Sequence, residues 1–231
     1  MRACYLLLVL ALLGADTPPT GGTVTGSVLA IQDSKVVTRK HVYVYLEPIG
    51  QRRGALPGTG IKKQIVQKNK QFAPRVVVVP IGAQVWFPNA DRDRHNVYSP
   101  TEPAFDLGTY GPSKQGKDHV FEDKDEFDIY CDVHRFMSAK VKVVDSPYIA
   151  QVVAGKFTFG NVAPGKYKVV AWGPNSSDVR YPKEITVTAG GTITLEREIH
   201  LQVKKPPLCH DRKDGTQYDK GEYGQCPPDF D

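Results

Sequence analysis

The chain has 231 residues, including 21 Gly and 18 Pro spread along its length, and this distribution argues against long helices. The formal net charge is +5, but Lys and Arg are mixed with acidic residues and form no basic run, which argues against nucleic-acid binding. Because Val, Thr, Tyr and Phe are plentiful, we predict an all-β protein, long enough for an export signal and two small domains.

The N-terminal residues have the pattern of a secretory signal. Arg2 precedes an apolar run at 5–13, and Gly14 and Ala15 follow it. The run is shorter than the roughly 20 apolar residues that cross a bilayer, and we find no later segment that could do so. We therefore predict a signal peptide at 1–15, no membrane span, and a secreted or periplasmic protein.

Alternating segments then predict strands at 23–28 and 41–46, followed by a loop at 48–60. Further strands are expected at 65–66, 75–79 and 84–87. We expect the aromatic side chains of Phe72, Trp86 and Phe87 to pack in the core of this part of the chain.

The densest group of metal-binding side chains lies between two predicted strands at 127–131 and 139–143. Cys131, His134 and Met137 fall within a turn too short for a helix, so all three can reach one point. His95 offers a fourth ligand from an upstream loop. Soft sulfur and imidazole donors select copper, and two His and one Cys with a weak axial Met is the blue-copper arrangement.

Other metal sites fit these residues less well. Structural zinc needs four Cys or His ligands, a dinuclear copper centre needs a second nearby Cys, and a multicopper oxidase needs His-x-His pairs. We interpret the three histidines His41, His119 and His200 as surface or strand residues rather than ligands.

The stretch from 65 to 144 resembles the cupredoxins, such as plastocyanin, pseudoazurin and amicyanin. The similarity is carried by Phe72-Ala73-Pro74, Gly82, Val85-Trp86-Phe87-Pro88-Asn89, His95-Asn96-Val97, Phe105-Asp106-Leu107-Gly108 and Tyr130-Cys131-x-x-His134-x-x-Met137. The resemblance implies a Greek-key β-sandwich that binds one type 1 copper ion.

In this resemblance, His95, Cys131 and His134 are the equatorial ligands and Met137 is the axial ligand. Asn96 would tie the two ligand loops together near the sulfur. His134 would lie at the surface as the electron port. We also expect Phe136 and Pro88 to contribute to an apolar docking patch. The sequence departs from the family at 123–126, where acidic residues and Lys replace the usual Pro-Gly turn.

A second β-sandwich is expected after a boundary at 145–148. Phe157 and Phe159 share one face, Pro164-Gly165 fits a type II turn, and Gly190-Gly191 fits another turn. The Gly-Lys-Phe at 155–157 and the Pro-Gly-Lys-Tyr at 164–167 resemble the prealbumin-like carboxypeptidase regulatory-like domain. Its opening strands would be those at 23–46, so the copper domain would be inserted into it. Alternatively, 23–46 are simply the first strands of the copper domain.

The predicted organisation is a signal at 1–15, strands of the accessory sandwich within 22–60, a cupredoxin domain at 61–146, the second sandwich at 147–204 and a tail at 205–231. Cys4 leaves with the signal, and Cys209 and Cys226 are expected to form a disulfide in an oxidising compartment. A tail metal site that includes His210 is the alternative.

We predict from these features an exported electron carrier with one copper ion, which transforms no substrate and so is not an enzyme. Its redox partner would be a c-type cytochrome or an exported oxidoreductase. Two alternatives remain. The same ligands could capture and deliver copper, or the accessory sandwich could make the protein an extracellular structural or interaction module.

Overall fold

The structure is a computed structural model that describes residues 21–50, 56–204 and 209–218. The predicted signal at 1–15 lies outside these residues, and so does Cys226. The disulfide between Cys209 and Cys226 therefore stays a prediction.

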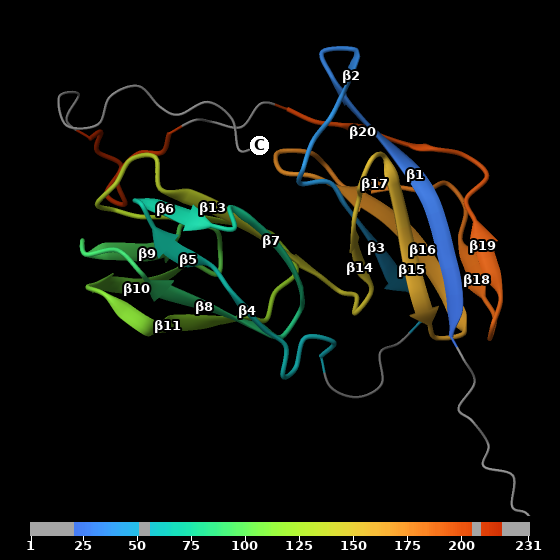
Figure 1. Cartoon of the computed structure of the whole chain (residues 1–231), viewed down its shortest axis with the longest axis horizontal. Coiled ribbons are helices and arrows are strands. Elements are labelled where there is room, and N and C mark those ends of the chain that lie inside the picture. The colour runs from blue at the N-terminus through green and yellow to red at the C-terminus, as the bar shows by residue number, and fades with distance from the viewer. Residues whose placement is uncertain (1–20, 51–55, 205–208, 219–231) are drawn as a thin grey trace, which may run out of the picture.

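The described chain folds into two β-sandwiches that lie side by side (Figure 1). The predicted all-β class is confirmed. Within the described residues, no helix is long and apolar enough to cross a bilayer.

The first sandwich, called here the site sandwich, is built from residues 62–144 as two five-stranded sheets. One sheet has the order β10-β9-β12-β13-β7 and the other has β11-β8-β5-β6, with β4 also paired to β8. The strands of the first sheet are β7 (Val76–Pro80), β9 (His95–Ser99), β10 (Phe105–Tyr110), β12 (Glu126–Tyr130) and β13 (Ser138–Val144). Those of the second are β4 (Lys62–Gln64), β5 (Val66–Lys68), β6 (Gln71–Ala73), β8 (Ala83–Asn89) and β11 (Ser113–Phe121).

Aromatic and β-branched side chains fill the core of the site sandwich. Phe72 and Phe87 are buried there as predicted, together with the candidate ligands Cys131 and Met137. Trp86 does not belong to this core, because it points to the other face of β8 and is only half-buried. Both candidate sulfur ligands therefore belong to the apolar core, although they lie in the turn between β12 and β13.

The second sandwich, called here the outer sandwich, combines strands from before and after the site sandwich. One sheet has the order β15-β1-β19, with β2 and β20 also paired to β1, and the other has β14-β3-β16-β17, with β18 paired to β16. Its strands are β1 (Gly22–Gln32), β2 (Lys35–Val37), β15 (Lys156–Val162), β19 (Thr192–Thr194), β20 (Ile199–Gln202), β3 (Tyr43–Pro48), β14 (Ile149–Gln151), β16 (Gly165–Trp172), β17 (Val179–Arg180) and β18 (Ile185–Val187). Because β1 pairs with β15 and β3 pairs with β16, the two early strands belong to this sandwich.

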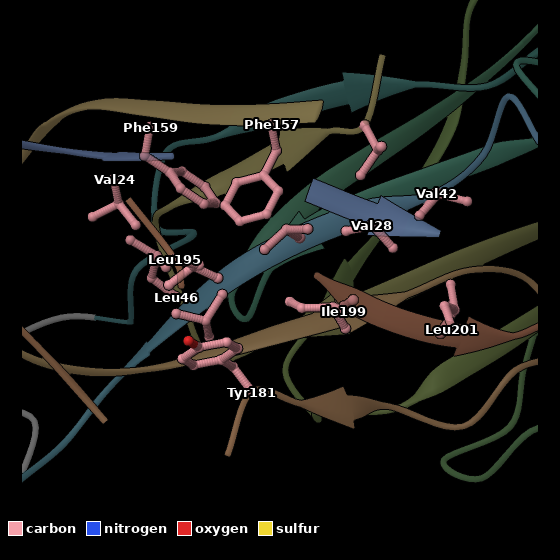
Figure 2. Packing of buried hydrophobic residues seen from close by; sticks show 14 of the residues in the cluster. Val24, Val28, Val42, Leu46, Phe157, Phe159, Tyr181, Leu195, Ile199 and Leu201 are labelled. Carbon is pink, nitrogen blue, oxygen red and sulfur yellow. The ribbon is translucent and has the colours of Figure 1, made fainter. Parts of the chain in front are cut away.

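Alternating apolar residues of both sheets meet in the outer sandwich core (Figure 2). Phe157 and Phe159 lie on the same face of β15, as predicted, with ring centroids 5.8 Å apart. The type II turn predicted at Pro164-Gly165 is wrong. The residue with positive φ is Asn161, at 55°, whereas Gly165 keeps an ordinary φ at the start of β16.

A third apolar cluster joins the two sandwiches. It consists of Tyr45, Val76, Val78, Val144, Val170 and Trp172. Polar contacts surround it: the Trp172 indole donates a hydrogen bond to Glu126 at 2.9 Å, and Lys142 pairs with Asp178 at 3.1 Å. The ammonium of Lys142 also lies 5.6 Å from the Trp172 ring centroid. The outer sandwich is thus packed directly on the site sandwich through β7 and β13.

We expect a fragment covering residues 148–204 not to fold on its own. It lacks β1 and β3, which supply the hydrogen-bonding partners of β15 and β16 and a large part of their shared core. Far-ultraviolet circular dichroism and a denaturant titration would test this, with the intact chain as the control. A cooperative unfolding transition of the fragment would show that the later strands are an independent unit.

Candidate metal centre

The ligand loop is the turn of residues 131–137 that joins β12 to β13. Its own backbone closes it: the Cys131 N–H donates to the Met137 carbonyl at 3.1 Å, and the Met137 N–H donates to the His134 carbonyl at 3.0 Å. The His134 N–H donates in turn to the Cys131 carbonyl at 3.3 Å. These bonds hold the three candidate ligands of the loop in a compact turn before any metal binds.

The fourth candidate ligand comes from β9, which pairs with β12 at Tyr98 and Tyr130. This register places His95 and Asn96 beside the start of the ligand loop. The Asn96 backbone N–H donates to the Cys131 sulfur at 3.5 Å, and the Asn96 side-chain oxygen accepts from the Asp132 N–H at 3.4 Å. Asn96 therefore contacts both ligand segments, in the position that the resemblance implied.

Three ligand atoms converge on one point. The Nδ1 atoms of His95 and His134 are 3.1 Å apart, the Cys131 sulfur lies 3.7 Å from the His134 Nδ1, and all three ligand atoms lie within 4.8 Å of one another. Nitrogen ligands about 2.0 Å and sulfur about 2.3 Å from one ion, at angles near those of a trigonal or tetrahedral site, lie about 3.3 to 3.7 Å apart. The separations of 3.1 Å between the two Nδ1 atoms and 3.7 Å between the Cys131 sulfur and the His134 Nδ1 are close to these values. The donor set thus fits a single metal ion.

All four candidate ligands are buried. His95, Cys131 and Met137 have no exposed surface, and His134 is 4% exposed. The expectation that His134 lies open at the surface is therefore wrong for this chain. Pro88 is also buried, as the sixth residue of β8, and so it cannot contribute to an exposed docking patch. Phe136 is half-buried.

Burial sets the protonation of the ligands in the metal-free protein. It raises the pKa of the Cys131 thiol, although the N–H groups of Asn96, Val133 and His134 oppose the shift. Burial, followed by the electrostatic influence of His95, lowers the pKa of His134 to about 4. At neutral pH, His134 is therefore a neutral imidazole, which is the form that binds metals.

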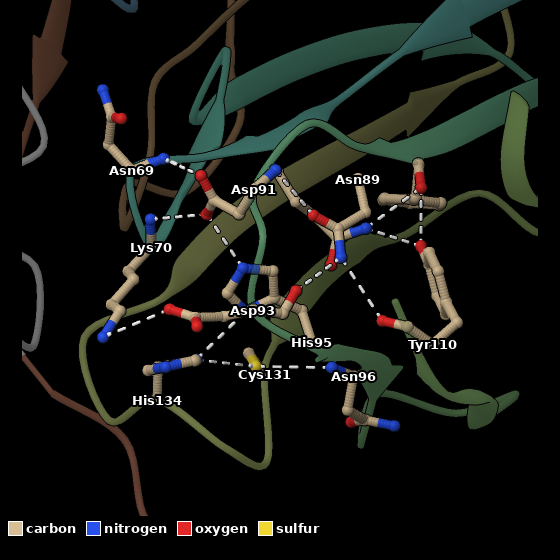
Figure 3. Close-up of polar contacts among 12 residues, drawn as sticks. Asn69, Lys70, Asn89, Asp91, Asp93, His95, Asn96, Tyr110, Cys131 and His134 are labelled. Atoms are coloured by element: carbon tan, nitrogen blue, oxygen red, sulfur yellow. Dashed lines mark hydrogen bonds and ion pairs between the residues drawn. The ribbon is translucent and has the colours of Figure 1, made fainter. Parts of the chain in front are cut away.

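An acidic side chain lies against the far nitrogen of His95 (Figure 3). The Nε2 of His95 and a carboxylate oxygen of Asp91 are 2.8 Å apart. Asp91 also accepts the backbone N–H groups of Asn69 and Lys70, at 2.6 and 2.8 Å. Although partial burial alone would raise it, the pKa of Asp91 lies below its ordinary value because Lys70, Asn69 and His95 stabilise the carboxylate.

Residues 209–218 of the tail pack on the outer side of the ligand loop. The Tyr218 hydroxyl donates to the Cys131 carbonyl at 2.9 Å, and the Lys213 N–H donates to the Asp132 carboxylate at 2.8 Å. The His210 ring stacks on Tyr130, with centroids 4.2 Å apart. The tail thus helps to bury the loop, a role that the sequence did not indicate.

Sequence reasoning identified the candidate ligands but missed Asp91 and the tail residues. The four-residue spacing of Asp91 and His95 was the available signal, but this pairing depends on how the intervening turn folds. His210 and Tyr218 lie far along the chain in a polar segment, and no local pattern assigns them a partner.

His119, expected at the surface, is half-buried and stacks on Phe105 with ring centroids 3.9 Å apart.

A family model described as "Polysaccharide lyase family 4, domain II" matches residues 136–195. The matched residues comprise β13 of the site sandwich and β14 to β19 of the outer sandwich, and this family is different from the carboxypeptidase regulatory-like domain suggested by the sequence. No curated protein matches the chain.

Several solved structures resemble part of the chain. A copper-containing nitrite reductase from Thermus scotoductus is 20% identical with a TM-score of 0.35, covering 42% of this chain and 25% of the reductase. Amicyanin from Paracoccus versutus is 22% identical with a TM-score of 0.34, covering 36% of this chain and 81% of amicyanin. A purple cupredoxin from Nitrosopumilus maritimus is 24% identical with a TM-score of 0.29, covering 36% and 99%. Because these similarities are partial, the case for copper depends on the ligand atoms themselves.

We predict that the metal-free protein loses stability as the pH falls from about 6.5 toward 4. The pKa of His134 is lowered from 6.5 to about 4 in the folded protein, so in this range the unfolded chain binds more protons. Stability from neutral His134 is therefore fully present above about pH 6.5 and is lost as the pH falls toward about 4. Denaturant midpoints measured across this range would show the decline.

His134→Gln should remove part of this pH dependence. His200→Gln is a matched control, because the His200 side chain is 61% exposed on β20 and far from the ligand loop in sequence. An unchanged pH dependence in His134→Gln would contradict the assignment of the titrating group.

Proposed function

We propose that this protein is an electron carrier with one type 1 copper ion, held by His95, Cys131 and His134 in the equatorial plane and by Met137 from the axis. The observation that supports it best is the convergence of two imidazole nitrogens and one thiol within 4.8 Å, all buried. Sulfur and imidazole donors in this combination favour copper among the common metals. When bound, copper would supply a one-electron couple between its cuprous and cupric states.

The scaffold suits electron transfer because it fixes the ligands independently of the metal. Cys131 and His134 are held by the closed turn, and His95 is held by a paired strand and the Asp91 carboxylate. A site whose ligands move little between two valence states loses and gains electrons quickly. We infer that the chain relays electrons between proteins and transforms no substrate.

The proposal extends to location and partners. The apolar N-terminal pattern supports export to a periplasm or the cell exterior, where a c-type cytochrome or an exported oxidoreductase would be the redox partner. The buried position of His134 means that such a partner would approach over the ligand loop rather than contact the imidazole edge directly.

Copper-loaded protein is expected to be intensely coloured, and Cys131→Ser is expected to abolish the colour. The thiolate of Cys131 is the donor for charge transfer to Cu(II), and a serine hydroxyl cannot replace it. Visible absorption and electron spin resonance of the two proteins give the result, with His200→Gln as a control that should keep the full spectrum. A colourless wild-type protein in excess copper would refute the proposed site.

Met137→Ala is expected to keep copper and raise its reduction potential. The axial thioether bond is long and weak, so its loss leaves the three stronger ligands in place but withdraws donation to the cupric ion. Metal analysis and voltammetry measure the two effects separately. Complete loss of copper would show that Met137 is a principal ligand and that the geometry is different.

Reversible cycling separates electron transfer from copper delivery. A carrier should retain copper through repeated reduction and oxidation in the presence of a cuprous chelator. Transfer of the metal to the chelator on reduction would instead favour delivery, with the same residues as ligands.

A further inference from the structure

Both ring nitrogens of His95 have a polar partner. Its Nδ1 faces the His134 Nδ1 at 3.1 Å, on the side of the Cys131 sulfur, while its Nε2 lies 2.8 Å from Asp91 (Figure 3). The ring itself has no exposed surface. A carboxylate can only accept a hydrogen bond in this place, so the proton of neutral His95 must be on Nε2. The lone pair of Nδ1 is then directed toward the site.

Asp91 is itself fixed from two directions. Asn69 and Lys70 form the two-residue turn between β5 and β6, with positive φ values of 55° and 56°, so that both of their N–H groups point at the carboxylate. The Asp91 backbone N–H donates to the Asn89 side chain at 2.9 Å. With its side chain only 13% exposed, Asp91 has little freedom to turn away from His95.

We propose that Asp91 is a positioning residue for the copper ligand His95, which it holds in the Nε2-protonated form and makes a stronger donor to the cupric than to the cuprous state. This inference rests on the proposed copper function. The negative charge of the Asp91 carboxylate, 2.8 Å from Nε2, raises the basicity of the His95 ring, as carboxylates do for histidine ligands of other metals. A more basic ligand favours the higher charge of Cu(II), and so Asp91 lowers the reduction potential of the site.

The test compares Asp91→Asn with wild type and with Asp93→Asn. The Asn side chain has the shape of Asp, and its amide oxygen can still accept the hydrogen bond from the His95 Nε2–H, but it lacks the negative charge. Asp93 lies in the same loop and its carboxylate pairs with Lys70 at 3.3 Å, so its replacement removes the same charge near the site without touching His95. The difference in reduction potential between Asp91→Asn and Asp93→Asn therefore reports the contact between Asp91 and His95, separately from the loss of a negative charge near the site.

We expect Asp91→Asn to bind Cu(II) about tenfold more weakly than wild type, at the lower end of the effect of such partners, with Cu(I) binding nearly unchanged. For a one-electron couple this tenfold difference equals a rise in reduction potential of about 59 mV. Asp93→Asn should move the potential much less. Equal reduction potentials in Asp91→Asn and Asp93→Asn would overturn the proposal for Asp91. If the wild-type protein still showed the visible spectrum of type 1 copper, the proposed copper function would be unaffected.

A second measurement needs neither a variant nor bound copper. Nitrogen NMR of the folded, metal-free wild-type protein should show His95 with its proton fixed on Nε2 and hydrogen-bonded. A proton on Nδ1, or exchange between both tautomers, would refute the positioning role. This result decides the case if Asp91→Asn does not fold. Failure of the wild-type protein to bind copper would instead count against the proposed function while leaving the tautomer result standing.

Discussion

The pairing of β9 with β12 at Tyr98 and Tyr130 is the contact on which the candidate site depends. Strand register is specified residue by residue, and a slip of one position would turn every side chain to the opposite face. With this register, Asn96 lies next to Cys131 and Asp132, and His95 is the residue before it, at the start of β9. A single antiparallel pairing therefore brings together two chain segments about 36 residues apart and aims their side chains at one point.

The outer sandwich also helps to fix the position of the ligand loop, because it packs against β7 and β13 of the site sandwich. Every residue of β13, which leaves the ligand loop directly after Met137, is buried. Val141 and Val143 face the core of the site sandwich, while Val144 packs with Trp172 of the outer sandwich. The neighbouring β7 is divided in the same way, which explains its uninterrupted run of valines. Both faces of β13, the strand that follows the ligand loop, are therefore covered by packed side chains, and this packing restricts its movement.

Much of this architecture could be read from the sequence because strands and metal ligands leave local signals. The alternation at 127–131 and 139–143 placed Cys131, His134 and Met137 in a turn, and donor chemistry alone favoured copper. The remaining features depend on contacts between segments distant in the chain. Nothing near Trp86 shows that it lies on the outer face of β8, and nothing near Tyr218 shows that its hydroxyl reaches Cys131. The burial of His134 likewise follows from the tertiary fold, whereas a family resemblance implied exposure.

Burial shifts the pKa values of two candidate ligands in opposite directions in the metal-free protein. It keeps His134 neutral, with a pKa of about 4, which prepares the imidazole for a metal, but it also raises the pKa of Cys131 and so opposes the thiolate. The protein offsets the second effect only in part, with N–H groups such as that of Asn96 directed at the sulfur. A cation between the sulfur and the two ring nitrogens would complete the compensation by displacing the thiol proton. Burial in the metal-free protein therefore favours a neutral imidazole at His134 and a neutral thiol at Cys131, and a bound cation is what would stabilise the thiolate.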